Sequence, residues 1–557
     1  MQNPWLFLKE HIAKNIGAKL EDIEEPIKEG LGDFAFPCFN LAKKERKNPH
    51  DIANNIAKNF HADPIKETKS IGAYVNFYVD WQEFSKRFLP MINDKYGSSD
   101  VGGGKTVIVE HSDPNIAKPM HVGHLRATVI GQSIYRIYKF LGYRCIAWNY
   151  IGDWGTQFGK VITAYKRWGS PQKLKKDSIK ELFRLYVKFH EEANKDSSLD
   201  EESRRWVKKL EDGDKETVKL WKQFNDLTLK DLKKVYKSMD AEFDLYLGES
   251  FFNRMAKESI REAVEKGIAT RDPTGAIVVD LSEYGLPSFL IQKSDEVTLY
   301  PTRDIALMKY RYDKYKFYRN IYVVGSEQKL HFQQVFKTCE LLGIKGVEKS
   351  VHVDYGLMSL PEGKLSTREG RVIFLEDLIE KAVELARKIV EKKNPKLSKK
   401  EKENVAKSVG IGSIKFNDLS NDRIHNITFD WKRMLSVEGK SAPYIQYTYA
   451  RASSILRKAK TKPRGKIKLE EPLEESIAKK LAQFPEIVEK SAKEYKPHFI
   501  ANYCFELAEI FNAFYQKLPV LKAEKNVRES RLRLVENVKV VLKNGLYLLG
   551  ITAPERM

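Results

Sequence analysis

Hydrophobic and polar positions follow different periods in successive stretches of the chain. Residues 1 to about 95 begin with the apolar spacing of an amphipathic helix and end in the alternating run IGAYVNFYVDW, which predicts a strand. At Thr106 the pattern changes to the short β-branched run TVIVEHS, then to a helical stretch and a second strand-like run, CIAWNYIGD. A strand, a helix and a strand in this order predict a βαβ unit, and hence a parallel sheet of the nucleotide-binding type.

The rest of the chain is mostly helical in pattern. A charged helical stretch near residues 166–250 is followed by expected strands at AIVVDL, NIYVVG and the start of VIFLEDL, and the chain after KNPKLSKKEKEN is helical to its end. We therefore predict an α+β N-terminal domain over residues 1–100 and an all-α domain over residues 396–557. Between them we expect an α/β domain over residues 101–395, with a Rossmann-type parallel sheet and a helical insertion near residues 166–250.

Composition changes this picture little. The 557 residues carry a formal net charge of +21, which suits either a polyanion-binding protein or a solvated lysine-rich surface, and charge alone does not decide between them. The four cysteines have neither zinc-ligand spacing nor the density of a disulfide framework. The chain has no signal-peptide pattern and no apolar run of about 20 residues, so we expect a cytoplasmic protein with no membrane segment.

The strongest local motif is His121-Val122-Gly123-His124, which follows the first predicted strand at the start of a helix. Two imidazoles three residues apart share one face of the first turn, where free N–H groups and the helix dipole favour an anion. Gly123 would let a base or a phosphate approach the backbone. In isolation the motif is better explained by two surface histidines that flank a helix start, and its position after SDPNIAKP and before the predicted helix changes this. The segment GGGKT at residues 102–106 lacks the first glycine and the following helix of a phosphate-binding loop, so it indicates a linker.

Longer motifs carry a family resemblance. The segments that carry it are, in chain order, HSDPNIAKPMHVGHLRATVIGQSI, NYIGDWGTQFGKV, LYPTRDIALMKYR, YVVGSEQKLHF, SVEGKSAPYIQYTYAR and GLYLLGITAPERM. They resemble the ordered blocks of arginyl-tRNA synthetases, in the class I aminoacyl-tRNA synthetase family. The resemblance implies an enzyme that activates arginine with ATP to arginyl-adenylate and transfers it to the terminal 2′-hydroxyl of its tRNA. It also implies that activation depends on bound tRNA, and that the last domain binds the anticodon.

The resemblance places the catalytic groups in two segments. His121 and His124 would contact the ATP phosphates, together with cations of the family's signature loop, here Lys364 to Arg368. The second lysine of that loop is replaced by Thr367, and Lys118 stands where a substituting lysine is expected. Which of Lys118, Lys364 and Arg368 meets the α-phosphate is left open by the sequence.

Recognition of arginine requires anionic and planar acceptors, because a guanidinium is a permanently charged fork of five donors. By resemblance, Glu110, Tyr300 and Asp304 would hold the guanidinium, and Asn115 and Gln328 would reach the amino and carboxylate end. Tyr300 and Asp304 lie four residues apart and share a face if they are helical. Each residue taken alone is better explained as a surface, salt-bridge or solvated residue, and it is their occurrence together that favours a binding site.

The resemblance also implies binding sites for ATP and tRNA. The expected ATP-binding residues are Gly123, Gly325, Glu327 and His331, with His121, His124 and Lys364. ATP with its Mg²⁺ is expected as a substrate, and no metal bound by the protein itself is expected. The expected tRNA contacts are Tyr74, Asn76, Tyr444, Arg451, Tyr515 and Met557, for which packing in a sheet or a helical core is the alternative.

Two other interpretations fit parts of the sequence. One is a different nucleotidyl-transferring enzyme on the same sheet, such as a synthetase for another amino acid, and the paired acids Glu110 and Asp304 argue against it. The other is a non-catalytic RNA-binding relative, against which the intact histidine motif argues. Fold alone decides neither. We expect a monomer, because the sequence shows no repeated apolar surface that demands a partner.

Overall fold

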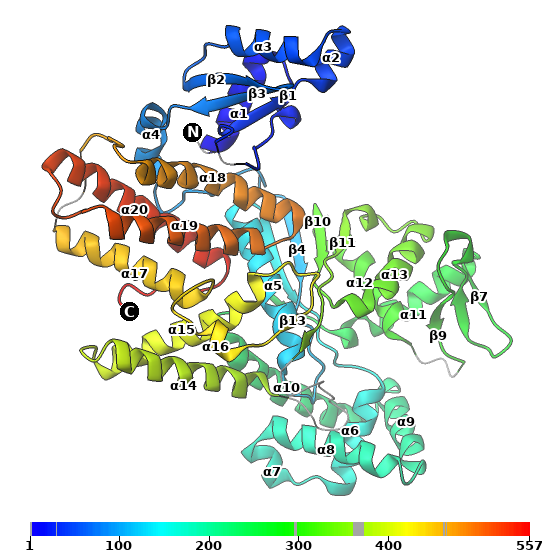
Figure 1. Cartoon of the computed structure of the whole chain (residues 1–557). Helices are drawn as coiled ribbons and strands as arrows, with labels where there is room; N and C mark the ends of the chain where they lie inside the picture. The colour runs from blue at the N-terminus through cyan, green and yellow to red at the C-terminus, as the bar shows by residue number, and fades with distance from the viewer. Residues whose placement is uncertain (1–2, 29, 295–297, 360–372, 461–462, 464) are drawn as a thin grey trace.

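The computed structural model describes residues 3–28, 30–294, 298–359, 373–460, 463 and 465–557. Its N-terminal part is a small α+β unit, seen in blue in Figure 1. The elements are α1 (Pro4–Ile16), β1 (Phe34–Pro37), α2 (Phe39–Glu45), α3 (Pro49–Asn59), β2 (Ile65–Ile71), β3 (Tyr74–Val79) and α4 (Trp81–Phe88). The strands form an antiparallel sheet in the order β1–β3–β2. The strand predicted from IGAYVNFYVDW is confirmed as β3, whereas β1 was missed because it is only four residues long.

A five-stranded parallel sheet forms the centre of the molecule, in the order β11–β10–β4–β5–β6. Its strands are β4 (Thr106–Glu110), β5 (Arg144–Asn149), β6 (Leu245–Tyr246), β10 (Arg319–Tyr322) and β11 (Ser350–His352). The helix α5 (Val122–Phe140) connects β4 to β5, so the predicted βαβ unit is confirmed. In β4, Val107 and Val109 enter one hydrophobic core and Ile108 enters another, so both faces of the sheet are covered.

Two expected strands differ from the prediction. AIVVDL does form a strand, β8 (Ile277–Val279), but it pairs with β7 (Ala269–Arg271) and β9 (Phe289–Gln292) in a separate antiparallel sheet. The expected strand at the start of VIFLEDL is wrong for the residues described: Phe374 makes one isolated bridge, to His121, and the helix α14 (Leu375–Lys393) begins at the next residue. Short apolar runs of three or four residues do not distinguish a strand from the buried first turn of a helix.

Helices surround the sheet. The expected insertion contains α6 (Thr156–Trp168), α7 (Pro171–Lys176), α8 (Ser178–Ala193), α9 (Ser198–Glu211) and α10 (Lys215–Ser238). The side of the sheet with the second core is packed by α11 (Glu249–Glu265), α12 (Tyr300–Tyr315) and α13 (Lys329–Leu341). Figure 1 shows α6–α9 and α11–β9 as two lobes on the same side of the molecule.

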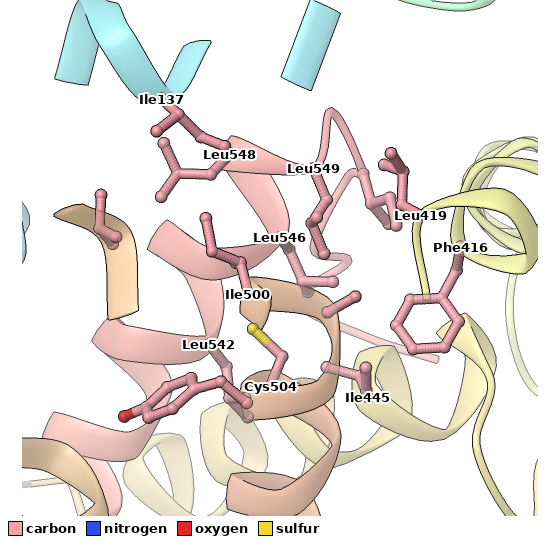
Figure 2. Close-up of a cluster of buried hydrophobic side chains, with 14 of the residues drawn as sticks. Ile137, Phe416, Leu419, Ile445, Ile500, Cys504, Leu542, Leu546, Leu548 and Leu549 are labelled. Carbon is pink, nitrogen blue, oxygen red and sulfur yellow. The ribbon is translucent and has the colours of Figure 1, made fainter. Parts of the chain in front are cut away.

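The C-terminal third is a helical bundle that shares its core with α5. Its helices are α15 (Lys399–Leu419), α16 (Trp431–Met434), α17 (Ala442–Ala459), α18 (Pro472–Glu494), α19 (His498–Lys517) and α20 (Lys525–Leu548). Figure 2 shows Ile137 of α5 beside Leu548 of α20, in one cluster with Phe416 and Cys504. The helix α5, which begins next to His121 and contains His124, is therefore held in place by its packing against the bundle. The predicted fold class is confirmed: a Rossmann-type parallel sheet with a helical insertion, an α+β N-terminal part and a helical C-terminal part. The all-α prediction for residues 396–557 has one exception among the described residues, the two-residue strand β13 (Ile427–Thr428), which pairs with β12 (Met358–Ser359).

Candidate active site

The loop between β4 and α5 has an unusual backbone. Ser112, Asp113 and Ala117 have φ values of 80°, 46° and 63°, in the left-handed region that residues with a Cβ atom rarely adopt. Each such residue costs on the order of 1 kcal/mol and persists only where the surroundings hold it. Here the Ser112 hydroxyl lies 2.8 Å from the Tyr236 hydroxyl, and the Tyr150 amide donates to Asp113 Oδ1 at 2.9 Å. The loop at the carboxyl end of the central strand is therefore held in a strained shape.

The two histidines of the motif cap the helix that follows this loop. His121 is the N-cap of α5, and its Nδ1 accepts a hydrogen bond from the Gly123 amide at 3.0 Å. His124 Nδ1 accepts from the His121 amide at 3.2 Å, and the ring centroids are 4.1 Å apart. A Cβ atom at position 123 would overlap the His121 ring, so glycine is required for this cap. The predicted shared face is confirmed, and both rings are partly exposed.

The same geometry sets the protonation of the rings. Burial, with a smaller effect from the positive charge of Lys118, lowers the pKa of His121 to about 4. Burial also holds the pKa of His124 well below its usual value, with smaller effects from His121 and Lys118. Both rings are therefore neutral at pH 7, and because each Nδ1 accepts a hydrogen bond, the ring proton lies on Nε2. The site presents two N–H donors that can meet an anion.

Lys118 is brought to this pair, as the sequence predicted. Its ammonium lies over the ring of Tyr186, 4.4 Å from the centroid, so the insertion helix α8 holds it. Its effect on the pKa of both histidines shows that its charge is close to them. Lys364 and Arg368 lie outside the described residues.

Both ends of the segment that contains Lys364 and Arg368 are fixed to the histidine helix. Downstream, the Val122 amide donates to the Ile373 carbonyl at 3.3 Å, and the Leu375 amide donates to the Met120 carbonyl at 2.9 Å. Upstream, Arg126 Nη1 donates to the Gly356 carbonyl at 2.5 Å, two residues before β12 (Met358–Ser359). The segment thus leaves and rejoins the described structure at α5.

A second group of predicted residues meets at the start of α12. Tyr300 and Asp304 lie on the first turns of that helix. His331 of α13 contacts both: its Nε2 is 2.7 Å from Asp304 Oδ2, and its ring centroid is 4.8 Å from that of Tyr300. The expected pairing of Tyr300 with Asp304 is present. His331 lies with the residues expected to bind arginine, rather than with the ATP-binding residues among which the sequence placed it.

Glu110 is less available than the sequence suggested. Its side chain is 4% exposed and forms an ion pair with Arg311, whose own side chain is fully buried between the rings of Trp148 and Tyr322. Burial raises the pKa of the Glu110 carboxyl, against the attraction of Arg311. The partner was missed because Glu110 and Arg311 are 201 residues apart in the chain.

Three carboxyl groups lie close to this single guanidinium. Asp304 raises the pKa of Glu110, and both Glu110 and Asp304 raise the pKa of Asp113, after the larger effect of burial. Asp113 was missed by the sequence analysis, although it stands in the SDPN segment beside the motif. A further cation beside these acids would relieve their mutual repulsion and favour their charged forms.

Of the remaining predicted residues of the site, Asn115, Glu327 and Gln328 are exposed and Gly325 is half-buried. Asn115 pairs with Gly152 in a parallel bridge, and its side chain occupies the place that a Cβ atom at position 152 would need. Gly325 pairs with Tyr355 and caps the short 3₁₀ turn of Ser326–Gln328, in which Glu327 and Gln328 are exposed. Asn115 lies in the loop that follows β4, and Gly325, Glu327 and Gln328 lie in the loop that follows β10, at the same edge of the sheet as Glu110.

Three of the expected tRNA contacts meet in the helical bundle. Arg451, Tyr515 and Met557 line one cavity of about 570 Å³, and the Arg451 guanidinium lies 4.9 Å from the Tyr515 ring centroid. Tyr447 lines the same cavity, is 42% exposed and lies 4.7 Å from the same guanidinium, but the sequence analysis missed it. Tyr444 is not among the lining residues and packs against Phe505, with ring centroids 5.5 Å apart.

The two expected contacts of the N-terminal part differ in exposure. Tyr74 is 38% exposed and meets Phe39, itself 52% exposed, edge to face at 5.6 Å. Asn76 is only 3% exposed, because β3 is the middle strand of its sheet. Tyr74 and Phe39 form an accessible aromatic surface, and Asn76 does not reach it.

No helix among the described residues is long and apolar enough to span a bilayer. Within the same ranges, no group of three or more histidine, cysteine, aspartate or glutamate side chains is placed to hold a metal ion. The four cysteines are free thiols.

Three family models match the chain in succession. Residues 90–431 match tRNA synthetases class I (R), catalytic domain. Residues 445–557 match the DALR anticodon binding domain, and residues 7–79 match the Arginyl tRNA synthetase N terminal domain.

Similar proteins cover nearly the whole chain. The arginine–tRNA ligase of Clostridium perfringens is 45% identical over 560 residues, which cover 98% of this chain and 99% of that protein. The arginine–tRNA ligase of Clostridium kluyveri is 46% identical over 561 residues, with the same coverage. Among solved structures, the arginyl-tRNA synthetase of Thermus thermophilus superposes with a TM-score of 0.84 at 28% identity, covering 99% of both chains.

Proposed function

The chain belongs to the arginyl-tRNA synthetase family and is an ATP-dependent arginine–tRNA ligase, and from this premise we propose how its residues carry the reaction. Arginine, ATP and tRNA are its substrates. In the first step the arginine carboxylate attacks the α-phosphorus of ATP, so that arginyl-adenylate forms and pyrophosphate leaves. In the second step the terminal 2′-hydroxyl of the tRNA takes the arginyl group, and AMP leaves.

His121 and His124 are proposed to bind the phosphates of ATP through their Nε2–H groups. A neutral donor that is already oriented stabilises developing negative charge without reorganisation, and such donors each contribute about 3 kcal/mol in comparable sites. Lys118, Lys364 and Arg368 would add positive charge, and Mg²⁺ would arrive with ATP as part of the substrate. The support for this arrangement is that both ends of the segment bearing Lys364 and Arg368 are attached to the first turns of α5.

Arginine is proposed to bind with its guanidinium at Tyr300 and Asp304. The Asp304 carboxylate is partly exposed and is held in place by His331. It can accept hydrogen bonds from the planar fork of N–H donors of a guanidinium. Glu110, held by Arg311, would add its charge to the pocket without being the main acceptor. Asn115 and Gln328 are assigned to the amino and carboxylate end, and Gly123, Gly325 and Glu327 to the adenosine of ATP. His331 is reassigned by this proposal from ATP to the arginine pocket.

The tRNA is proposed to be held at both ends of the molecule. Arg451, Tyr515 and Met557, with Tyr447, suit unstacked anticodon bases, because aromatic rings beside a cation favour stacking. Tyr74 is assigned to another part of the tRNA. Asn76 and Tyr444 keep only an indirect role, in supporting the neighbouring surfaces. The proposed division of labour follows residues 1–100, 101–395 and 396–557, in a cytoplasmic monomer.

One experiment tests the enzyme proposal against that of a non-catalytic RNA-binding relative. ATP–pyrophosphate exchange is measured with arginine and with lysine, each with and without arginine tRNA. We expect exchange with arginine only, and only when tRNA is present. Folded protein that shows no exchange under any of these conditions would refute the proposed chemistry and favour the RNA-binding alternative.

A further inference from the structure

The insertion helix α8 contacts the active site at two points. The ammonium of Lys118 lies 4.4 Å from the centroid of the Tyr186 ring. One turn earlier on α8, the Phe183 ring meets the Phe374 ring edge to face, with centroids 5.7 Å apart. Phe374 in turn forms the isolated bridge to His121. One helix of the lower lobe in Figure 1 therefore contacts both of the chain segments that meet at the histidine motif.

The Tyr186 ring is a fixed surface. It is 6% exposed and belongs to the main hydrophobic core, together with Leu182 of the same helix and Phe158 of α6. His190 of the next turn lies edge to face against it, with ring centroids 4.7 Å apart. A side chain that is packed in this way keeps one position, so the ring offers a cation a constant place.

The ammonium of Lys118 needs such a place if it is to act at one position. It stands on a flexible four-carbon chain, whose rotamer freedom is large. The backbone before it is already held by the insertion, because the Ala117 amide donates to the Thr228 hydroxyl of α10 at 3.3 Å. The face of the Tyr186 ring attracts the ammonium and so restricts the side chain as well.

The position of this ammonium matters for the two histidines. Its positive charge lowers the pKa of His121 and of His124, in each case after the larger effect of burial. A charge that acts on these two rings also acts on an anion that they bind. The place of the Lys118 charge is therefore part of the site, and the ring that sets this place lies on a different element.

We propose that Tyr186 is a positioning residue for adenylate formation, because its ring holds the Lys118 ammonium beside the two histidines. The inference rests on the proposed function, which assigns Lys118 to the phosphates of ATP. Tyr186 acts through Lys118 and does not itself touch the substrates. The face of the ring performs this role, and not the phenol hydroxyl.

A series of side chains at position 186 separates the ring face from its bulk. Tyr186→Phe keeps the electron-rich face, trifluorophenylalanine at this position keeps the ring but withdraws electron density from its face, and Tyr186→Leu removes the ring. In pyrophosphate exchange with saturating tRNA, kcat should stay within about twofold of the wild type for Tyr186→Phe, fall about threefold for the fluorinated ring and fall about tenfold for Tyr186→Leu. The KM for arginine should change less than about twofold in all three, since a cation misplaced at the phosphates affects the reacting step and not the arginine pocket.

Two controls test whether the effect passes through Lys118. Tyr165→Leu removes another ring of the insertion, which packs against Phe224, and should keep the wild-type kcat. In a Lys118→Met background, Tyr186→Leu should lower kcat no further, because the two residues act as one pair. An equal loss with and without Lys118 would mean that Tyr186 supports only the fold. A Tyr186→Phe variant as slow as Tyr186→Leu, or a fluorinated ring as fast as Tyr186→Phe, would mean that the ring face is not the working group. Each of these results overturns the proposal.

A readout that needs no catalysis separates this proposal from the proposed function. When the ammonium leaves the ring, the pKa of His121 should rise, because a charge that lowers it moves away. Histidine NMR signals followed over pH should show this rise in Tyr186→Leu, and neither in Tyr186→Phe nor in Tyr165→Leu. An unchanged pKa of His121 in Tyr186→Leu overturns the proposal. The expected rise, found for a wild-type protein that shows no exchange, would refute the function and leave the positioning of Lys118 intact.

Discussion

The buried ion pair of Arg126 and Asp418 joins the histidine helix to the helical bundle, and its loss should weaken both folding and catalysis. Arg126 Nε lies 3.2 Å from each carboxylate oxygen of Asp418, and both side chains are 1% exposed. The guanidinium also donates to the carbonyls of Gly356, His425 and Arg423 at 2.5, 2.9 and 3.2 Å. One side chain therefore connects α5, α15 and the chain just before β12.

The magnitude follows from what the substitution Asp418→Ala leaves behind. Burial raises the pKa of Asp418 while Arg126 lowers it, so the intact pair is a balance between desolvation and attraction. Removing one partner leaves a buried guanidinium without a counter-charge, which costs about 3 to 5 kcal/mol of the free energy of unfolding. The matched control is Glu403→Ala. It breaks the Arg387–Glu403 pair between α14 and α15, whose side chains are 38% and 36% exposed, and should cost at most about 1 kcal/mol.

Denaturant unfolding of the two variants and the wild type measures this difference. Pyrophosphate exchange measures the catalytic effect. In Asp418→Ala we expect kcat to fall about tenfold to a hundredfold. The reason is that Arg126 holds residues 356–359 beside α5, and without Asp418 these residues shift relative to the two histidines. The KM for arginine should change much less, since Tyr300 and Asp304 lie on α12, away from the pair. If Asp418→Ala and Glu403→Ala destabilise equally, the reasoning from burial is wrong. If kcat is unchanged in folded Asp418→Ala, the pair has no positioning role.

Three further predictions test the remaining assignments. In His121→Asn the asparagine side chain can still accept the capping hydrogen bond at the start of α5, so the melting temperature should change little. The Nε2–H donor proposed for the ATP phosphates is lost, so kcat for exchange should fall about a hundredfold. Because the pKa of His121 is lowered to about 4, the unfolded chain binds more protons between pH 6.5 and 4. The free energy of unfolding should therefore fall as the pH falls through that window, and a pH titration of urea unfolding should show less of this fall in His121→Asn. Asp304→Asn should raise the KM for arginine about a hundredfold, because a charged acceptor that is largely shielded from solvent is lost, and an unchanged KM would exclude Asp304 from the arginine site. Tyr447→Ala should weaken tRNA binding about tenfold and leave exchange at saturating tRNA near the wild-type rate, and a fall in that rate instead would contradict a purely binding role.

The fold was largely predictable because its signals are local. The β-branched run of β4 and the helical period of α5 lie within forty residues, and their order implies a parallel sheet with right-handed connections. The prediction from the sequence was wrong where the hydrophobic period and the length of a segment do not identify its structural partner. β8 has the pattern of a core strand, yet it belongs to a separate antiparallel sheet, because strand partners are set by packing and not by the strand itself.

Some groupings of the expected site residues could be predicted from the sequence, but most of their contacts could not. Asp304 and Tyr300 could be paired from their spacing on one helix, as the structure confirms. Arg311 could not be assigned to Glu110, and Tyr447 could not be distinguished from the core tyrosines of α17. In each case the deciding contact or exposure depends on elements far apart in the chain, which no single-sequence periodicity records.

The structure changes the physical reason for the anion site predicted at the histidine motif. The sequence suggested that free amides at the start of α5 attract an anion. In the structure, the Gly123 and His121 amides are already bonded to the histidine Nδ1 atoms, so these two donors are no longer free. The two hydrogen bonds instead fix the proton of each neutral ring on Nε2. The affinity for an anion is thereby moved from the backbone to the two side chains, and it requires that both rings stay uncharged, which their burial ensures.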